Sequence, residues 1–303
     1  MKYLLIIGFI LLISLIIMVF IGIHFLRYIV NPKKLSLNLS RRIENKNHHL
    51  DFIDEKNIIN YNVIMDDSYI IPVYLIKNNS NKFVILSHGH TVTHYNSFKY
   101  AKIFYEDNYN VIMYDSRGHG DNEKSIITLG HLESKDLKTI INDTFSKYDN
   151  DIYLGIHGES MGAITSNLTL KYQQNIKFII SDSSFKDEIY HLKYFVKHMF
   201  NMPSFMVYFG SLACIIKYHF SFNSIAPIKY IKKNQIPICF IHGLEDDYIL
   251  PENTKQLYEA NIGYKELHLF DNAKHARCLQ SNPELYYNTI KNFLKKVEVI
   301  YEK

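Results

Sequence analysis

A serine lies between two glycines in the segment Gly158 to Gly162, which reads Gly-Glu-Ser-Met-Gly and follows the apolar run 152–156 after one residue, His157. That run predicts a buried strand, and apolar residues at helical spacing follow from Met161. A serine in a Gly-x-Ser-x-Gly pattern between a strand and a helix lies in a sharp turn. The turn needs small neighbouring residues and lifts the hydroxyl clear of the sheet. We therefore predict that Ser160 is the nucleophile of a hydrolase.

A serine hydroxyl is a weak nucleophile at neutral pH, so the prediction requires a histidine base and a carboxylate that orients the histidine. Both residue types follow the serine in the chain order Ser, Asp, His that belongs to this pattern. Asp246 comes after the apolar run 236–241, and His275 follows the last predicted strand. We predict a catalytic triad of Ser160, Asp246 and His275.

Two nearby residues compete for these roles. Asp247 is the alternative acid, because it lies four residues before Pro251; we favour Asp246. His268 falls within a predicted strand, where a packed or exposed side chain is expected rather than a catalytic one.

The tetrahedral intermediate of acyl transfer needs two hydrogen-bond donors aimed at its oxygen. One is the backbone N–H after the nucleophile, here that of Met161, and the other comes from the loop after an earlier strand. That loop contains Ser-His-Gly-His-Thr at 87–91, and the backbone N–H of His90 is the best candidate. His88 and His119 are expected to hold the neighbouring loops rather than to react.

Four motifs together resemble one protein family. They are His-Gly-x-Thr at 88–91, Arg-Gly-His-Gly at 117–120, Gly-Glu-Ser-Met-Gly at 158–162 and His-Gly-x-x-Asp at 242–246. In this order the chain is similar to α/β-hydrolases of the serine aminopeptidase-like branch, especially to bacterial members with an N-terminal membrane helix. The resemblance covers residues 59–297 and implies the same triad and a substrate that is an ester, a thioester, a lipid or a peptide. The family's proline after the acid comes one position late, at Pro251, so the choice between Asp246 and Asp247 stays open.

The elements that position these residues follow from an alternation of short apolar runs and longer amphipathic runs, which predicts an α/β fold with a mostly parallel central sheet flanked by helices. A hairpin of 59–65 and 70–76 begins the domain, which is predicted over 58–303. Further strands are predicted at 83–87, 111–115, 152–156, 178–181, 236–241 and 266–270, and helices at 98–105, 133–148, 161–172, 252–260 and 283–297.

About forty residues rich in Phe, Tyr, Met and Lys interrupt this alternation and predict a helical cap inserted at about 184–224. Its longest apolar run, 205–216, has 12 residues and is too short to cross a membrane. Phe205 and Phe209 are candidate substrate-binding residues of an acyl groove, or alternatively part of the cap's own core. The cap has no obvious acidic partner for a free amino group. This favours ester or thioester substrates over aminopeptidase action.

The N-terminus predicts a membrane anchor over 1–27. Residues 3–26 are 24 residues without a formal charge, long enough for roughly 36 Å of helix, which spans the hydrocarbon core of a bilayer. We favour an uncleaved anchor over a signal peptide, whose apolar region is usually shorter and is followed by a small-residue cleavage site. Gly8 and Gly22 are too far apart for a helix-dimer motif, so no specific protein partner is indicated.

The polar segment 28–57 is predicted to be a basic stalk near lipid headgroups, or else an ordinary linker. Basic residues follow the apolar span and outnumber those before it. By the positive-inside rule they favour a cytoplasmic catalytic domain, and the alternative is an exported protein held by its N-terminus. The expected partners are therefore the lipid bilayer and a small-molecule acyl substrate.

Composition disfavours several other classes of protein. The chain has 303 residues and a net charge of +4, without the basic cluster that nucleic-acid binding requires. Its three cysteines, Cys214, Cys239 and Cys278, are far apart and odd in number, which indicates neither a disulfide framework nor a zinc site. The histidines of 88–94 do not match metallohydrolase spacing. We expect no cofactor and no metal; a zinc hydrolase and a catalytically silent scaffold are the rival interpretations.

Overall fold

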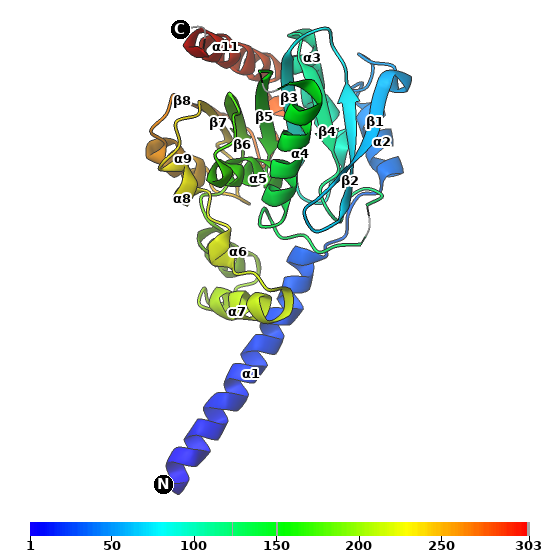
Figure 1. The fold of residues 1–303 in the computed structure, drawn as a ribbon. Helices are drawn as coiled ribbons and strands as arrows, with labels where there is room; N and C mark the ends of the chain where they lie inside the picture. Colours follow the sequence, from blue (N-terminus) through cyan, green and yellow to red (C-terminus); the bar gives the residue numbers. More distant parts are fainter. Residues whose placement is uncertain (123, 150, 302–303) are drawn as a thin grey trace. The chain divides into compact units, whose positions relative to one another are not determined.

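The chain is seen in a computed structural model that describes residues 1–122, 124–149 and 151–301. It divides into two compact units. Unit 1 comprises Met1–Lys33 and Asp187–Ala226, and unit 2 comprises Lys34–Lys186 and Pro227–Lys303. All the strands of the described chain belong to unit 2, whereas unit 1 holds the N-terminal helix and the cap (Figure 1).

Unit 2 is built on an eight-stranded sheet with the order β1-β2-β4-β3-β5-β6-β7-β8. The strands are β1 Ile58–Ile64, β2 Ile70–Ile76, β3 Lys82–Ser87, β4 Asn110–Tyr114, β5 Tyr153–Glu159, β6 Phe178–Asp182, β7 Ile238–Gly243 and β8 Lys265–Phe270. β2 pairs antiparallel with β1 and with β4, and every other pairing is parallel. The predicted α/β fold with a mostly parallel central sheet is confirmed.

The helices of unit 2 cover both faces of this sheet. They are α2 Leu37–Lys46, α3 Phe98–Glu106, α4 Glu133–Tyr148, α5 Met161–Thr169, α8 Ile228–Ile231, α9 Glu252–Ala260, α10 Cys278–Ser281 and α11 Pro283–Tyr301, with single 3₁₀ turns at Glu55–Asn57, His94–Ser97 and Leu170–Tyr172. Successive strand residues point to opposite faces. Val84 and Leu86 therefore pack with α3 and α11 in one apolar cluster. Phe83 and Ile85 pack with α4 in the other.

The segment 28–57 differs from the predicted stalk, because unit 2 already begins at residue 34. Its helix α2 is tied to the domain by polar contacts. The guanidinium of Arg41 forms an ion pair with Glu55 at 2.8 Å, and the hydroxyl of Tyr95 donates a hydrogen bond to Glu55 at 3.1 Å. Residues 34–57 are thus part of the folded domain. Polar contacts of this kind leave no apolar periodicity, so they could not be predicted from the sequence.

Unit 1 consists of helix α1 (Lys2–Val30), the cap helices α6 (Glu188–Met199) and α7 (Met206–Tyr218), and a 3₁₀ turn at Phe222–Ser224. The span Lys2–His24 of α1 is long and apolar enough to cross a membrane, although a signal sequence meets the same criterion. α1 packs against α7 at Gly22, where an added Cβ would lie 3.1 Å from the carbonyl oxygen of Phe209. The N-terminal helix therefore packs against another helix of the same chain. The spacing of glycines that marks helix dimers does not detect such a contact.

Candidate active site

The turn that carries Ser160 joins the end of β5 to the start of α5. Ser160 has φ 55° and ψ −116°, in a region that non-glycine residues rarely occupy. Its N–H donates a hydrogen bond to the carbonyl of Asp182 at 2.8 Å. An added Cβ at Gly158 would lie 2.4 Å from the backbone of Gly162, and one at Gly162 would lie 1.9 Å from the carbonyl oxygen of Ser87. Neither glycine position has space for a side chain, which is the physical basis of the motif.

The structure brings Ser160, His275 and Asp246 together. The distance from Ser160 Oγ to His275 Nε2 is 2.8 Å, and His275 Nδ1 lies 2.7 Å from Asp246 Oδ2. The three residues follow β5, β8 and β7, respectively. Because these strands are parallel, their carboxyl ends meet at one edge of the sheet. Three residues that are far apart in the sequence are therefore joined by hydrogen bonds between their side chains.

The carboxylate of Asp246 is fully buried and held by four groups. Its Oδ1 accepts hydrogen bonds from the N–H groups of Tyr248 at 3.0 Å and Ile249 at 2.9 Å. Its Oδ2 lies 3.0 Å from His242 Nε2, in addition to the contact with His275. Burial by itself would raise the pKa of Asp246, but the hydrogen bonds and charges of His242 and His275 lower it well below its usual value. Asp246 is thus an ionised acceptor for the imidazole N–H.

The two alternatives considered from the sequence, Asp247 and His268, occupy other positions. Asp247 is exposed, and of the two adjacent aspartates it is Asp246 that contacts His275. His268 belongs to β8, where its Nε2 lies 2.9 Å from Glu266 Oε2. The geometry therefore favours Asp246 as the orienting acid.

A cavity of about 370 Å³ surrounds the Ser160 hydroxyl. His90 lines it together with His275 and Tyr248. Met161 is the first residue of α5, where backbone N–H groups have no partner within the helix. Of the two predicted oxyanion donors, His90 thus lies in the cavity wall and Met161 lies at the start of the helix that follows the nucleophile.

The imidazoles of His88 and His119 hold the loops at this edge. His88 Nε2 accepts a hydrogen bond from the N–H of Ser116 at 2.9 Å, and His119 Nε2 accepts one from the N–H of Thr91 at 3.2 Å. Burial lowers the pKa of both imidazoles. Both are therefore neutral acceptors and brace the loop that carries His90.

Glu159 and Lys99 line the same cavity and were not found from the sequence. The buried carboxylate of Glu159 forms an ion pair with Lys99. It also accepts hydrogen bonds from the hydroxyl of Tyr100 and, at 3.1 Å, from the amide of Asn96. Burial would raise the pKa of Glu159, but Lys99 and these donors lower it. Lys99 shares a helical face with Lys102 and Glu106, so its sequence context is that of an ordinary exposed lysine and does not reveal the contact.

We expect Lys99→Met to lower the free energy of unfolding by roughly 3–5 kcal/mol, because it leaves the Glu159 carboxylate buried without its counter-charge. Thermal unfolding of the purified protein measures the effect. Lys102→Met is the matched control on the same helix, since Lys102 is about half exposed and lies 3.8 Å from Glu106; its effect should stay within about 0.5 kcal/mol. Equal effects of the two substitutions would contradict the buried-pair interpretation.

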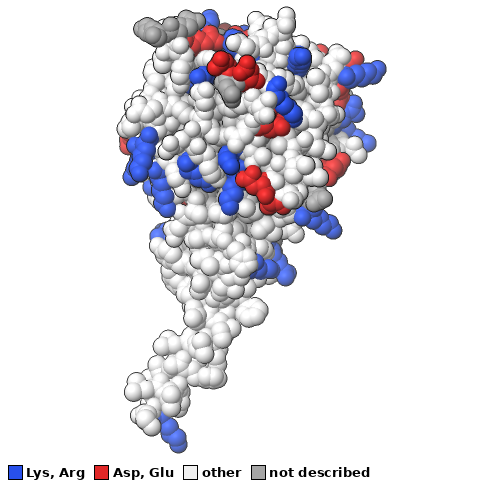
Figure 2. Space-filling model, in the orientation of Figure 1, with Lys and Arg blue, Asp and Glu red and all other residues white. Residues whose placement is uncertain are grey.

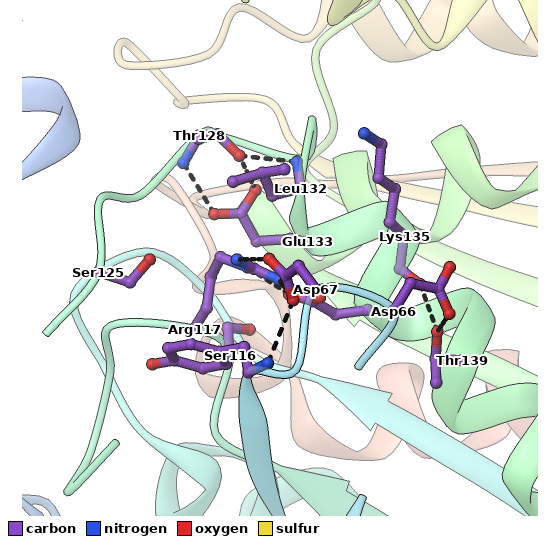
Figure 3. A network of polar contacts seen from close by, with 12 residues as sticks. Asp66, Asp67, Ser116, Arg117, Ser125, Thr128, Leu132, Glu133, Lys135 and Thr139 are labelled. Atoms are coloured by element: carbon purple, nitrogen blue, oxygen red, sulfur yellow. Dashed lines mark hydrogen bonds and ion pairs between the residues drawn. The ribbon is translucent and has the colours of Figure 1, made fainter. Parts of the chain in front are cut away.

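The arginine of the Arg-Gly-His-Gly motif has a bracing role (Figure 3). Arg117 Nε donates to Asp136 of α4 at 2.7 Å, and its Nη1 donates to Asp67 of the β1–β2 turn at 3.0 Å. Burial raises the pKa of Asp136 to about 6, against the opposing effect of Arg117. The guanidinium thus ties the loop after β4 to α4 and to the sheet edge.

Within the described residues, no three or more His, Cys, Asp or Glu side chains are arranged to hold a metal ion. Cys214, Cys239 and Cys278 are buried and free.

Comparison with protein families gives two matches along the chain. Residues 78–208 match the model of the family described as serine aminopeptidase, S33. Residues 220–300 match the model described as PhoPQ-activated pathogenicity-related protein. The uncharacterized protein YqkD of Bacillus subtilis is 31% identical over 214 residues, which cover 70% of this chain and 70% of that protein.

Solved structures share the fold. The Pyrococcus furiosus esterase Pf2001 superimposes with a TM-score of 0.67 at 22% identity, over 88% of this chain and 98% of the esterase. The Pyrococcus horikoshii acylaminoacyl peptidase gives a TM-score of 0.60 at 17% identity, over 80% of this chain and 41% of the peptidase.

Proposed function

Because the chain belongs to the α/β-hydrolase superfamily, we propose that it is a membrane-anchored serine hydrolase that cleaves carboxylic esters or thioesters. The observation that carries the proposal is the hydrogen-bonded chain from Ser160 through His275 to Asp246, beside an open cavity. A nucleophile, a base and an orienting carboxylate in this order are what acyl transfer through a covalent intermediate requires.

In the proposed mechanism, His275 Nε2 accepts the proton of Ser160 Oγ as this oxygen attacks the carbonyl carbon of the substrate. The N–H groups of Met161 and His90 stabilise the oxyanion that forms. His275 then gives the proton to the leaving alcohol or thiol, and an acyl-enzyme remains on Ser160. A water molecule deprotonated by His275 then attacks the acyl carbon, the bond to Ser160 Oγ breaks, and His275 returns the proton to Oγ as the acid leaves. Asp246 holds the imidazole in one orientation throughout.

The charges around the cavity favour esters over peptides with a free amino terminus. Among the described residues that line it, Glu159 is the one with an acidic side chain. Its carboxylate is already bound by Lys99, Tyr100 and Asn96. A substrate ammonium group therefore has no available counter-charge there. Amide hydrolysis stays the second candidate, because the serine aminopeptidase family model matches residues 78–208.

Two measurements on the full-length protein in detergent test the proposal. A fluorophosphonate probe should label the protein at Ser160, which neither a zinc hydrolase nor a silent scaffold would do. A series of p-nitrophenyl esters should be cleaved faster than aminoacyl-nitroanilides; the reverse order would assign amide hydrolysis. If Phe205 and Phe209 bind the acyl chain, each added CH₂ should raise kcat/KM up to about fourfold, equivalent to about 0.8 kcal/mol.

For the anchor, we expect the full-length protein to stay with membranes during extraction with alkaline carbonate. The most apolar 18-residue window of the span Lys2–His24 has no buried residue, and hydrocarbon accommodates such an exposed apolar surface whereas water does not. Replacing Leu11 and Leu15 with Arg should release the protein, since each charge at the centre of a span costs about 2.5–3.5 kcal/mol. A mature protein that begins just after Leu26 would show a cleaved signal sequence instead.

The side of the membrane is part of the same proposal. Arg27 and Lys33 follow the apolar span, and Lys2 precedes it, which favours a cytoplasmic catalytic domain. The domain should then be digested by an added protease in inside-out vesicles and protected in right-side-out vesicles.

A further inference from the structure

We propose that the cap helix α7 is a second membrane contact, which lies in the headgroup region of the bilayer beside the end of α1 and presents an apolar face to anionic lipid. The inference rests on the proposed anchoring by α1, and it uses contacts within unit 1 alone. It concerns how the cap is held, not the reaction at Ser160.

Helix α7 is mostly apolar, and one of its apolar sides is exposed. Val207, Ser211 and Cys214 lie on its buried side. The opposite side carries four large apolar residues, between 38% and 59% exposed, at positions that share one helical face. They are Tyr208, Leu212, Ile215 and Ile216, and we call them the α7 stripe. A helix at a water-facing surface normally presents polar residues there. Lys193 donates a hydrogen bond to the hydroxyl of Tyr208 at 2.7 Å, but the described chain leaves much of this apolar face exposed.

The length of α7 indicates what covers this face. Its 13 residues extend about 20 Å, too short to cross the hydrocarbon core of a bilayer. An apolar helix of this length is either a core helix or an interfacial segment. The exposure of the α7 stripe excludes the first alternative within the described chain and leaves the second.

Contacts inside unit 1 place α7 at the level where α1 leaves the hydrocarbon. Gly22 and Leu26 of α1 line a small apolar cavity together with Val207 and Gly210 of α7, and the apolar span of α1 ends at His24. Figure 1 shows α7 lying across α1 rather than along it. If α1 crosses the bilayer, α7 therefore runs along its surface, as interfacial helices do.

The charge of unit 1 fits an anionic surface. Its basic residues are Lys2, Arg27, Lys33, Lys193, Lys197 and Lys217, and its acidic residues are Asp187 and Glu188. The six basic and two acidic residues give +4, which equals the net charge of the whole chain, so unit 2 is neutral overall. Lys2 lies at the other end of the apolar span, so the end of α1 that packs on α7 and the cap together carry +3. The surface of α1 is uncharged along most of its length (Figure 2). Each basic residue close to anionic headgroups contributes about 1 kcal/mol of attraction.

The chain contains no tryptophan, so a single introduced Trp reports its own surroundings without background. We would prepare three full-length variants in vesicles of phosphatidylcholine and phosphatidylglycerol, with bromine quenchers attached high or low on the acyl chains. Ile216→Trp probes the α7 stripe, and Phe9→Trp probes the middle of α1. Ile262→Trp is the matched control in unit 2, because Ile262 is 63% exposed, close to the 59% of Ile216.

We expect Ile216→Trp to lose roughly half of its emission to the high-bromine lipid, as a side chain about 5–10 Å deep in the headgroup boundary would. Phe9→Trp should be quenched mainly by the low-bromine lipid, and Ile262→Trp by neither. Quenching of Ile216→Trp should weaken in vesicles of phosphatidylcholine alone. Equal quenching with and without phosphatidylglycerol would show that the basic residues of unit 1 do not contribute to binding. All three variants should keep wild-type ester hydrolysis, since none of these residues lines the cavity at Ser160.

Two results would overturn the inference about α7, and each can be distinguished from a failure of α1 to span the membrane. If Phe9→Trp is quenched while Ile216→Trp behaves like Ile262→Trp, α1 spans the membrane and α7 stays outside it. If the emission of Ile216→Trp shifts to the blue without quenching by either lipid, a second copy of the chain covers the α7 stripe. If Phe9→Trp itself is not quenched, the proposed anchoring is wrong.

Discussion

Ser160→Ala is expected to lower ester hydrolysis by about 10³-fold or more while the protein stays folded. Ser160 Oγ is the attacking atom, and His275 Nε2 at 2.8 Å is positioned to take its proton. His275→Ala should cause a similar loss, because the two residues act as one unit. The double variant should be hardly slower than either single one, as the remaining rate comes from the oxyanion donors and substrate binding. Steady-state kinetics with a p-nitrophenyl ester, together with thermal unfolding, measure both effects.

Ser166→Ala is the matched control for the loss of a serine hydroxyl. Ser166 lies on the same helix, and its Oγ donates to the carbonyl of Gly162 at 2.7 Å. Its removal should cost about 1 kcal/mol of stability and leave turnover nearly unchanged. Near wild-type turnover by purified Ser160→Ala would show that another residue is the nucleophile.

Asp246→Asn should lower kcat by about 10⁴-fold, because an amide can turn an N–H toward the imidazole and stabilise the wrong tautomer. The carboxylate lies 2.7 Å from His275 Nδ1 and is fixed by two backbone N–H groups. Its neighbour supplies the control, since Asp247 is exposed. Asp247→Asn should therefore change kcat by no more than about twofold. The opposite ranking of the two variants would move the orienting role to Asp247.

The sheet and the candidate triad could be predicted because each depends on local patterns. Short apolar runs mark strands that are buried on both faces, and turns at the carboxyl ends of β5, β7 and β8 carry the three reactive side chains. Parallel strands then bring these turns to one edge without further information from the sequence. The turns that carry Ser160, His275 and one of the two adjacent aspartates could therefore be predicted to meet, and the folded structure shows that Asp246 is the aspartate that contacts His275.

The contacts that could not be predicted join polar or small residues far apart in the chain. Lys99 meets Glu159 inside the protein, and Arg41 meets Glu55, yet each of these residues is ordinary in its local sequence. The contact of Gly22 with Phe209 is of the same kind. Such pairs leave no periodic pattern and no motif in the sequence, so they can be identified only in the folded structure.

The packing of α1 on α7 has a consequence for how the protein is made. The two helices are separated by about 175 residues of chain. At about 5–20 residues per second, a ribosome needs roughly 9–35 s to synthesise the intervening segment. During that interval α1 has left the ribosome, and the helix that will cover Gly22 and Leu26 does not yet exist. If α1 crosses the membrane as proposed, lipid alone must accommodate it at first, and unit 1 is completed when the cap is synthesised and packs on a helix already in place.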